Sequence, residues 1–292
     1  MESMMRISRV GISTWVYFWR PLTEVLKDIV EATYPYVEIW ADKTHLDPRI
    51  SPDLSAVKDL LNSLHLKVHS LHAPFSGVNI ASLDEEERKN SLEHIKKSME
   101  SCSEIEGEIV IIHPFSTETS GDDQSYLRAK NKTEDSLCTL ATFAEKLGIK
   151  LAVENMTGKR RVGSDISELI ELVTKINNPC LGLCLDTGHS FVGKEDVDLS
   201  KNVLECGRNL FALHIQDTDG KKDRHWLPGQ GIINWAQFMK DLVSIDYQGV
   251  LTLEISGSPE FAERNVDHIL PKAMESIKNV LKLRESIGRR RS

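Results

Sequence analysis

Short apolar runs recur along the chain, and longer amphipathic stretches separate them. Eight such runs, rich in Val, Ile and Leu, lie at 9–13, 36–40, 67–72, 108–113, 149–154, 181–186, 211–216 and 249–254. Most of them are too apolar to be the half-exposed strands of an antiparallel sheet. The pattern therefore predicts eight strands of a parallel sheet that is covered on both faces.

The stretches between the runs carry helical patterns. Residues 21–32 begin with Pro21, which suits the first turn of a helix, and they place four apolar side chains on one face. The helix expected at 126–148 ends on Gly148, a residue that commonly terminates helices. Further helices are expected at 84–105, 164–176, 234–245 and roughly 260–285.

The alternation of strands and helices predicts a (β/α)8 TIM barrel in the α/β class, formed as a single domain. A doubly wound sheet is the alternative. It usually has a glycine-rich turn after its first strand, and the stretch GISTWVYFWRP contains no G-x-G-x-x-G. We expect the domain to cover 1–292, with a barrel core at about 9–286 and a basic, solvated tail at 287–292.

Composition narrows the class of protein. The chain has 292 residues, of which 40% are hydrophobic and 27% charged, as in ordinary globular proteins. It has no apolar run long enough to span a membrane and no recognisable signal peptide, and its five cysteines form no C-x-x-C pair. We expect a cytoplasmic protein with reduced cysteines and no membrane partner. The net charge of −8 disfavours nucleic acid as the main partner.

Histidine, aspartate and glutamate side chains gather at the ends of the expected strands. The set comprises His72, His113, Glu154, Asp186, His189, His214 and Glu254, with Asp223 and His225 in the loop after the seventh strand. The active site of a TIM barrel lies at this end of the strands. Buried carboxylates at such density repel one another unless cations neutralise them. The pattern therefore predicts a divalent metal site, and its mixed imidazole and carboxylate ligands suit Mn²⁺ or Zn²⁺, with Co²⁺, Fe²⁺ or Mg²⁺ as alternatives.

The stretch DTGHS, at the end of the sixth run, leaves three roles open when it is considered alone. Asp186 could cap the following helix, bind a metal or take part in chemistry. The neighbouring strand ends favour metal binding for Asp186. His189 stays divided between a substrate contact and a ligand of a further metal.

Nearly the whole chain resembles the xylose isomerase-like barrel superfamily of sugar-phosphate isomerases and epimerases, which is related to endonuclease IV. The resemblance is carried by HAPF, IIHP, AVEN, CLDTGH, HIQDTDGKKDRHWLPGQGIINW and LTLE. It implies a metal held by Glu154, Asp186, His214 and Glu254. It also implies that Glu154 and Glu254 are the catalytic acid–base pair, and that protons are transferred through a metal-stabilised enediolate.

The same resemblance implies a small-molecule sugar or sugar phosphate as substrate and a role in carbohydrate metabolism. It also implies one to three metal ions. The oligomeric state is left open between a monomer and a homo-oligomer. The expected substrate contacts are His189, His72, His113 and Trp15. Trp15, Trp19, Trp40 and Trp226 are expected near the mouth of the barrel, where they would stack on a sugar or pack in loops. Arg160 and Arg161, or the backbone around Gly229 and Gly231, are weaker candidates for binding a substrate phosphate. The other histidines, at 45, 65, 69, 94 and 268, are expected on the surface or on helices.

A competing hypothesis uses the same nine side chains. They match, residue by residue, the pattern with which endonuclease IV relatives hold three zinc ions and cleave abasic DNA, so nucleic acid is a partner only under this alternative. A related dehydratase is a further alternative. Three features favour the sugar enzymes. The loop reads DRHWLPGQG where the nuclease loop usually continues DRHEHIG, its ending LPGQGIINW is typical of the sugar group, and so is the opening stretch GISTWVYFWRPLTEVLKDIVEATYPYVEIW.

Overall fold

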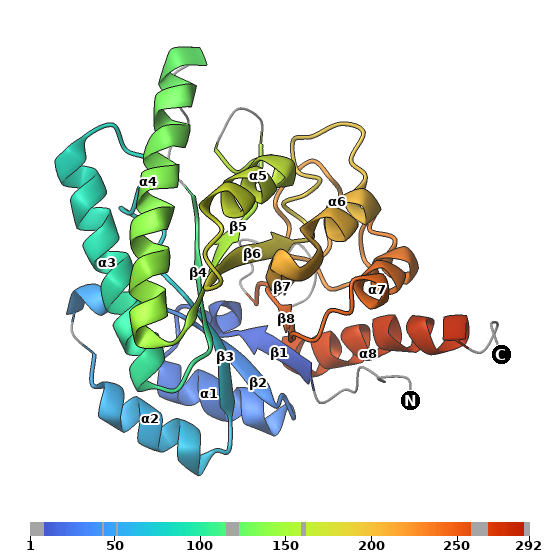
Figure 1. The fold of residues 1–292 in the computed structure, drawn as a ribbon. Helices are drawn as coiled ribbons and strands as arrows, with labels where there is room; N and C mark the ends of the chain where they lie inside the picture. The colour runs from blue at the N-terminus through green and yellow to red at the C-terminus, as the bar shows by residue number, and fades with distance from the viewer. Residues whose placement is uncertain are drawn as a thin grey trace.

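The eight expected strands form a closed parallel barrel in a computed structural model of the chain (Figure 1). Each strand pairs with the next, and β1 (Val10–Ser13) pairs with β8 (Leu251–Leu253) to close the ring. The structure describes residues 9–42, 44–50, 52–114, 123–158, 162–257 and 268–288. The prediction of a single-domain (β/α)8 barrel is confirmed.

The strands follow the apolar runs closely. Three have the expected limits: β2 (Tyr36–Trp40), β3 (Lys67–His72) and β6 (Leu181–Asp186). The others are shorter or shifted by one or two residues at an end, namely β4 (Ile109–Ile112), β5 (Lys150–Glu154) and β7 (Leu210–Ile215), together with β1 and β8. As a result His113 and Glu254 directly follow their strands, while His214 lies within β7.

Helices surround the barrel, and α4 extends beyond its neighbours at one end (Figure 1). Their bounds are α1 (Leu22–Glu31), α2 (Leu54–Ser63), α3 (Glu85–Glu104), α4 (Asp123–Leu147), α5 (Ile166–Ile176), α6 (Leu199–Cys206), α7 (Trp235–Ser244) and α8 (Ile269–Gly288). The sequence pattern did not single out α2 and α6. Both helices are short, with eight residues in α6 and ten in α2. Each still has an apolar face: Leu199, Val203 and Cys206 are buried on α6, and Leu54, Val57 and Leu60 pack on the core beside the buried Leu61 of α2.

Two helix predictions need correction. The last helix, expected at roughly 260–285, begins at Ile269 and continues to Gly288, and residues 258–267 lie outside the described part of the chain. The basic tail expected at 287–292 lies outside it from residue 289 onward. Pro21 lies one position before the first turn of α1, because its backbone is extended, with a φ of −58° and a ψ of 135°. Among the described residues, no helix has both the length and the apolar character needed to cross a bilayer.

The barrel interior has an apolar floor and a polar upper layer. The floor consists of Ile109, Ile111, Ala152, Cys184 and Ala212, which pack together inside the ring. Inward-facing positions closer to the carboxyl ends of the strands carry acids, histidines and hydroxyls. A much larger apolar cluster fills the space between the strands and the surrounding helices. The outer core therefore supplies most of the hydrophobic burial, and the top of the barrel is available for polar chemistry.

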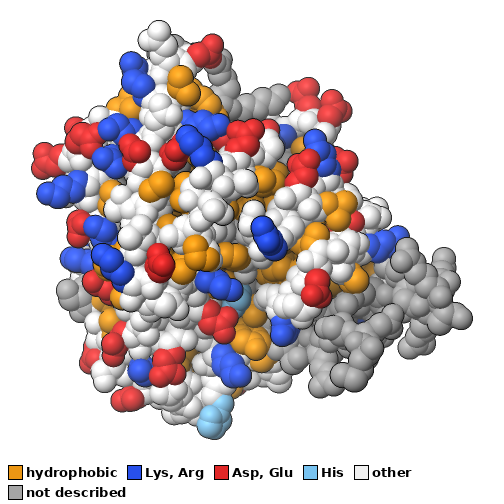
Figure 2. Space-filling model, viewed as in Figure 1, with side chains coloured by type: hydrophobic (Ala, Val, Ile, Leu, Met, Phe, Trp, Pro, Cys, Tyr) orange, Lys and Arg blue, Asp and Glu red, His pale blue; other side chains and the backbone are white. Residues whose placement is uncertain are grey.

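The outer surface carries charges of both signs. On the face drawn in Figure 2, Lys and Arg side chains alternate with Asp and Glu over the helices, and hydrophobic side chains show between them. Ion pairs such as those of Lys132 with Glu85 and Lys175 with Glu134 connect neighbouring helices. On this face the charges form a mixed surface of the kind that keeps globular proteins soluble.

His45 is buried, which contradicts its expected surface position. It is 5% exposed, its Nδ1 lies 3.0 Å from the Thr14 hydroxyl, and its Nε2 lies 3.1 Å from the carbonyl of Arg20. The Thr14 oxygen already accepts from the backbone N–H of Trp40, so its own proton is free to be donated to Nδ1. This arrangement fits a neutral ring, and burial lowers the pKa of His45 to about 4. His69 is buried too, beside Glu108, whereas His65 and His268 are exposed as expected.

We expect His45 to make the fold sensitive to acid. Its pKa is about 4 in the folded protein and about 6.5 in an unfolded chain, so between these values the unfolded state binds the extra proton. The free energy of unfolding should fall by roughly 1 kcal/mol for each pH unit below about 6.5 because of this residue. In urea titrations between pH 7 and pH 5, His45→Gln should lose less stability than the wild type. The exposed His65→Asn serves as control, and equal slopes for wild type and His45→Gln would contradict the prediction.

Candidate active site

Four side chains converge at the carboxyl ends of consecutive strands. Glu154 ends β5, Asp186 ends β6, His214 lies near the end of β7, and Glu254 follows β8. All four are buried, and each offers a ligand atom within 4.8 Å of the others. Asp186 also accepts the backbone N–H of His189 at 2.6 Å, so it caps the following turn while it faces the centre of the group. The interpretation of Asp186 as the cap of the following helix is wrong, because α6 begins at Leu199 and its N-cap is Asp198. The place of Asp186 in the central group fits the metal-binding interpretation.

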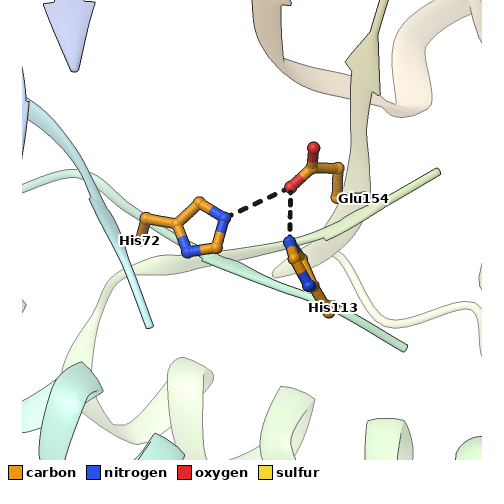
Figure 3. A group of neighbouring side chains, drawn as sticks. All are labelled: His72, His113 and Glu154. Carbon is orange, nitrogen blue, oxygen red and sulfur yellow. Dashed lines mark hydrogen bonds and ion pairs between the residues drawn. The ribbon is translucent and has the colours of Figure 1, made fainter. Parts of the chain in front are cut away.

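Glu154 connects this central group to a second one. One of its oxygens, Oε2, lies 3.3 Å from Nε2 of both His72 and His113, and Figure 3 shows the two rings pointing at that single atom. The other oxygen, Oε1, lies 3.1 Å from Nδ1 of His214 and 3.2 Å from Nδ1 of His189. Together, His72, His113 and Glu154 form a second group of potential ligands.

The loop after β7 completes a third group. Oδ2 of Asp223 lies 3.1 Å from Nε2 of His189 and 3.2 Å from Nε2 of His225. Nδ1 of His225 donates to the carbonyl of Glu254 at 2.9 Å, which leaves Nε2 facing the group. His225 has a φ of 46°, an uncommon conformation for a residue other than glycine. All nine residues predicted from the sequence are thus brought together, in three adjoining groups.

Gln216 holds two of these groups together, and the sequence analysis passed over it. Its Nε2 lies 3.2 Å from Oδ2 of Asp186 and 3.1 Å from Oδ1 of Asp223, and its Oε1 accepts the backbone N–H of His225 at 2.9 Å. A Cβ atom at position 188 would lie 2.4 Å from the Gln216 amide, so the glycine of DTGHS leaves the space that this amide fills. The sequence feature that could have identified Gln216 is its polar side chain at the end of an apolar run, two positions after His214.

Glu38 is the second residue that the sequence analysis missed. It lies on β2, has no exposed surface, and binds Nε2 of His214 at 3.0 Å and the hydroxyl of Ser70 at 2.8 Å. Burial disfavours its charge, but the charge of His214 outweighs this effect and the pKa of Glu38 falls to about 2. The sequence feature that could have identified Glu38 is an acid in the middle of the apolar run YVEIW, where a side chain is expected to be buried.

Burial and the charges of neighbouring residues shift the pKa values of the ionisable side chains in the site. Burial favours the neutral form of Glu154, but His214 and the other surrounding imidazoles hold its pKa well below the usual range. Burial raises the pKa of Glu254 to about 7. Burial opposes the charging of His225, but Asp223 raises its pKa to about 9. Burial opposes the charging of His214 as well, but Cys184 and the nearby carboxylates raise its pKa well above its usual value. Protons thus compensate the buried negative charge when no cation is bound.

The donor set fits a divalent cation. The central group supplies three carboxylates and one imidazole, all buried, which is the mixed oxygen and nitrogen set of Mn²⁺ and Zn²⁺ sites. The other two groups supply two imidazoles and one carboxylate each. Bound cations would remove the repulsion between carboxylates that otherwise share protons with the histidines.

Aromatic side chains border the site on one side. The ring of Trp15 lies 4.5 Å from the ring of His225, and Phe75 stacks on His113 at 5.1 Å. Trp15 is therefore placed where the sequence analysis expected it. Trp40 and Trp226 are buried, whereas Trp19 is 45% exposed.

The phosphate positions suggested by the sequence gain no support. Arg160 and Arg161 lie outside the described residues. Gly229 has a φ of 89° and forms the expected turn, but its N–H already donates to Oδ2 of Asp217 at 2.8 Å. Gly231 packs against the same aspartate, so this segment mainly fixes the loop.

Comparison with known proteins gives a consistent set of relatives. Residues 26–280 match the family model described as a xylose isomerase-like TIM barrel. Fructoselysine 3-epimerase of Escherichia coli O157:H7 is 26% identical over 259 residues, which cover 85% of this chain and 90% of that protein. Inosose isomerase of Bacillus licheniformis is 28% identical over 261 residues, with 85% and 88% covered.

Solved structures agree with these matches. A D-tagatose 3-epimerase-like protein superposes with a TM-score of 0.81 at 26% identity, covering 96% of this chain and 99% of that one. The zinc-bound IOLI protein has the same fold, with a TM-score of 0.78 at 20% identity. Probable endonuclease 4 of Aquifex aeolicus is also similar, at 26% identity over 213 residues, which cover 68% of this chain and 72% of that protein.

Metal affinity should increase with pH. In the metal-free protein, raised pKa values keep protons on His214 and His225, and these protons must leave before the rings can bind a cation. The apparent affinity for Mn²⁺ should rise between pH 6 and pH 8, by up to about tenfold per pH unit for each proton released. Calorimetry in buffers of different ionisation enthalpy would count these protons.

Asp186→Asn, which removes one charged ligand, should weaken Mn²⁺ binding at every pH. An affinity that is independent of pH, or equal in this variant and the wild type, would contradict the assignment of these side chains as ligands.

Proposed function

We propose that this chain, which belongs to the xylose isomerase-like TIM barrel family, is a metal-dependent isomerase or epimerase of a sugar or sugar phosphate. One observation carries the proposal. Glu154 and Glu254 come from strands three apart in the ring of eight, and their carboxylates approach the same nitrogen of His214, at 3.1 Å and 3.4 Å. Two acids that face one buried point from different sides can act on one substrate.

The central group would hold the cation through Glu154, Asp186, His214 and Glu254. A cation held there would supply Lewis acidity, which makes a proton next to a substrate carbonyl easier to remove.

The two glutamates would carry the protons. One carboxylate removes the proton from the carbon next to the substrate carbonyl, and the electron pair of that C–H bond moves toward the carbonyl. The other carboxylic acid returns a proton to the opposite face of the same carbon, which gives an epimer, or to the neighbouring carbon, which gives an isomer. The burial of both side chains excludes bulk water, which would otherwise exchange with the transferred proton.

The remaining polar and aromatic groups would orient the substrate. His72, His113 and His189 surround Glu154, and a substrate bound beside this carboxylate would lie against their rings. Trp15 offers a flat apolar surface at the edge of the site. The similar epimerases and isomerases are named for fructoselysine, inosose and D-tagatose, all sugar-derived compounds, and this supports the same class of substrate here.

A phosphodiesterase is the second candidate, and one observation favours it. All nine predicted ligands meet in three adjoining groups, as three metal ions would require. A probable endonuclease 4 is among the similar proteins. Against this candidate stand the net charge of −8 and the absence of a second histidine in DRHWLPGQG.

Deuterium exchange provides a direct test of the proposed function. With Mn²⁺ and a panel of ketoses in D₂O, the protein should place deuterium on the carbon next to the carbonyl of at least one sugar, detected by NMR. Glu154→Gln and Glu254→Gln should each lower turnover at least about 100-fold, because each removes one of the two proton carriers. Glu108→Gln, an acid paired with His69 outside the site, is the matched control and should retain turnover.

Two outcomes would reject the proposal. The first is the absence of exchange with every ketose together with cleavage of abasic DNA, which would establish the phosphodiesterase. The second is full turnover in both glutamate variants, which would show that the acid–base pair is wrongly assigned.

A further inference from the structure

Glu38 is a buried carboxylate that belongs to none of the three ligand groups. It lies on the inner face of β2, between Ser13 of β1 and Ser70 of β3 in the strand register. Its side chain has no exposed surface. Among the described residues, its Oε1 has no hydrogen-bond partner, while Oε2 accepts from Ser70 at 2.8 Å and lies 3.0 Å from His214. An acid in such a place needs a reason, because desolvating a carboxylate is unfavourable.

The contact with His214 defines which nitrogen of that ring can bind a cation. Nδ1 faces the carboxylates of Glu154 and Glu254, whereas Nε2 faces Glu38. When Nε2 donates its proton to Glu38, the lone pair of a neutral ring lies on Nδ1, directed at the central group. The ring is also stacked on His72, with centroids 5.7 Å apart and planes 13° apart, so its orientation is constrained from two sides.

Glu38 itself is held firmly. The Ser70 hydroxyl can donate only one proton, and that proton goes to the oxygen of Glu38 that binds His214. Serines on both neighbouring strands leave room for the carboxylate between them. The charge of Glu38 therefore lies directly behind the ring of His214, on the side away from the central group.

We infer that Glu38 is a positioning residue that orients His214, keeps the ring proton on Nε2 and thereby strengthens Nδ1 as a metal ligand. The inference rests on the proposed function, since it requires a cation in the central group. Carboxylates that accept the outer proton of a ligating histidine strengthen its donor nitrogen, and their loss typically weakens metal binding. Glu38 also brings a further negative charge close to the site, which favours a dication there.

Metal binding measured directly tests this inference without relying on turnover. The dissociation constant for Co²⁺ would be obtained by chelator competition for wild type, Glu38→Gln, Glu38→Leu and Glu108→Gln. Glu38→Leu should weaken binding roughly 10- to 100-fold, and Glu38→Gln less, because an amide oxygen still accepts the proton but has no charge. Glu108→Gln removes the charge from another acid beside a buried histidine, His69, and should leave the constant unchanged.

Proton NMR of the Co²⁺-loaded protein gives a second readout. The N–H of a ligating histidine is shifted by the nearby paramagnetic ion, and a buried N–H that donates to a carboxylate exchanges slowly with water. One such signal should be present in the wild type and lost, or exchange rapidly, in Glu38→Leu. Should that variant fail to fold, Ser70→Ala releases Glu38 without changing any charge and should weaken Co²⁺ binding by a smaller factor than Glu38→Gln.

The possible outcomes distinguish the role of Glu38 from the proposed function itself. Wild-type binding of Co²⁺ with an unchanged constant and an unchanged N–H signal in folded Glu38 variants would overturn the role of Glu38 and leave the proposed enzyme intact. A wild-type protein that binds no divalent cation would overturn the metal site of the proposed function and this inference with it.

Discussion

The repulsion between carboxylates enclosed in the mouth of the barrel is the constraint on which the site depends. Closing a parallel sheet into a ring directs every second side chain inward, and at the carboxyl end these positions bring Glu154, Asp186 and Glu254 within reach of one another. Glu154 and Asp186 have no exposed surface and Glu254 has little, so their charge has to be compensated locally. Histidines compensate part of it by holding protons, and a divalent cation in their midst would do so more completely.

The rest of the fold supplies the stability that offsets the cost of these buried charges. The apolar cluster between the strands and the helices supplies hydrophobic stabilisation that does not depend on the barrel interior. Within the ring, small apolar side chains such as Ala152 and Ala212 form the floor, and the polar layer lies above it. Hydrogen bonds then fix the ligands individually: Gln216 orients Asp186 and Asp223, and backbone carbonyls orient His72 and His225.

Much of the fold and most of the site could be predicted from the sequence. Eight apolar runs with helical patterns between them define a barrel, and in a barrel the residues at the strand ends must meet, so seven of the nine ligand candidates followed from their positions. The other two, Asp223 and His225, lie in the loop after the seventh strand, and the resemblance to endonuclease IV added them to the set. Glu38 and Gln216 did not follow. Glu38 lies in the middle of a strand. Only the closure of the ring shows that its carboxylate contacts Nε2 of His214. The burial of His45 depends on how the loop after β2 folds back onto Thr14, which no local pattern specifies.

The shared carboxylate of Glu154 has a consequence for how the site would fill. Its Oε1 belongs to the central group and its Oε2 to the group of His72 and His113. A cation in either group would draw electron density from the same carboxylate and would displace protons from the histidines that contact it. Occupancy of the two groups would therefore be thermodynamically linked, and by reciprocity each would change the affinity of the other by the same factor. The number of ions held would then be a collective property of the cluster, set by metal concentration and pH together.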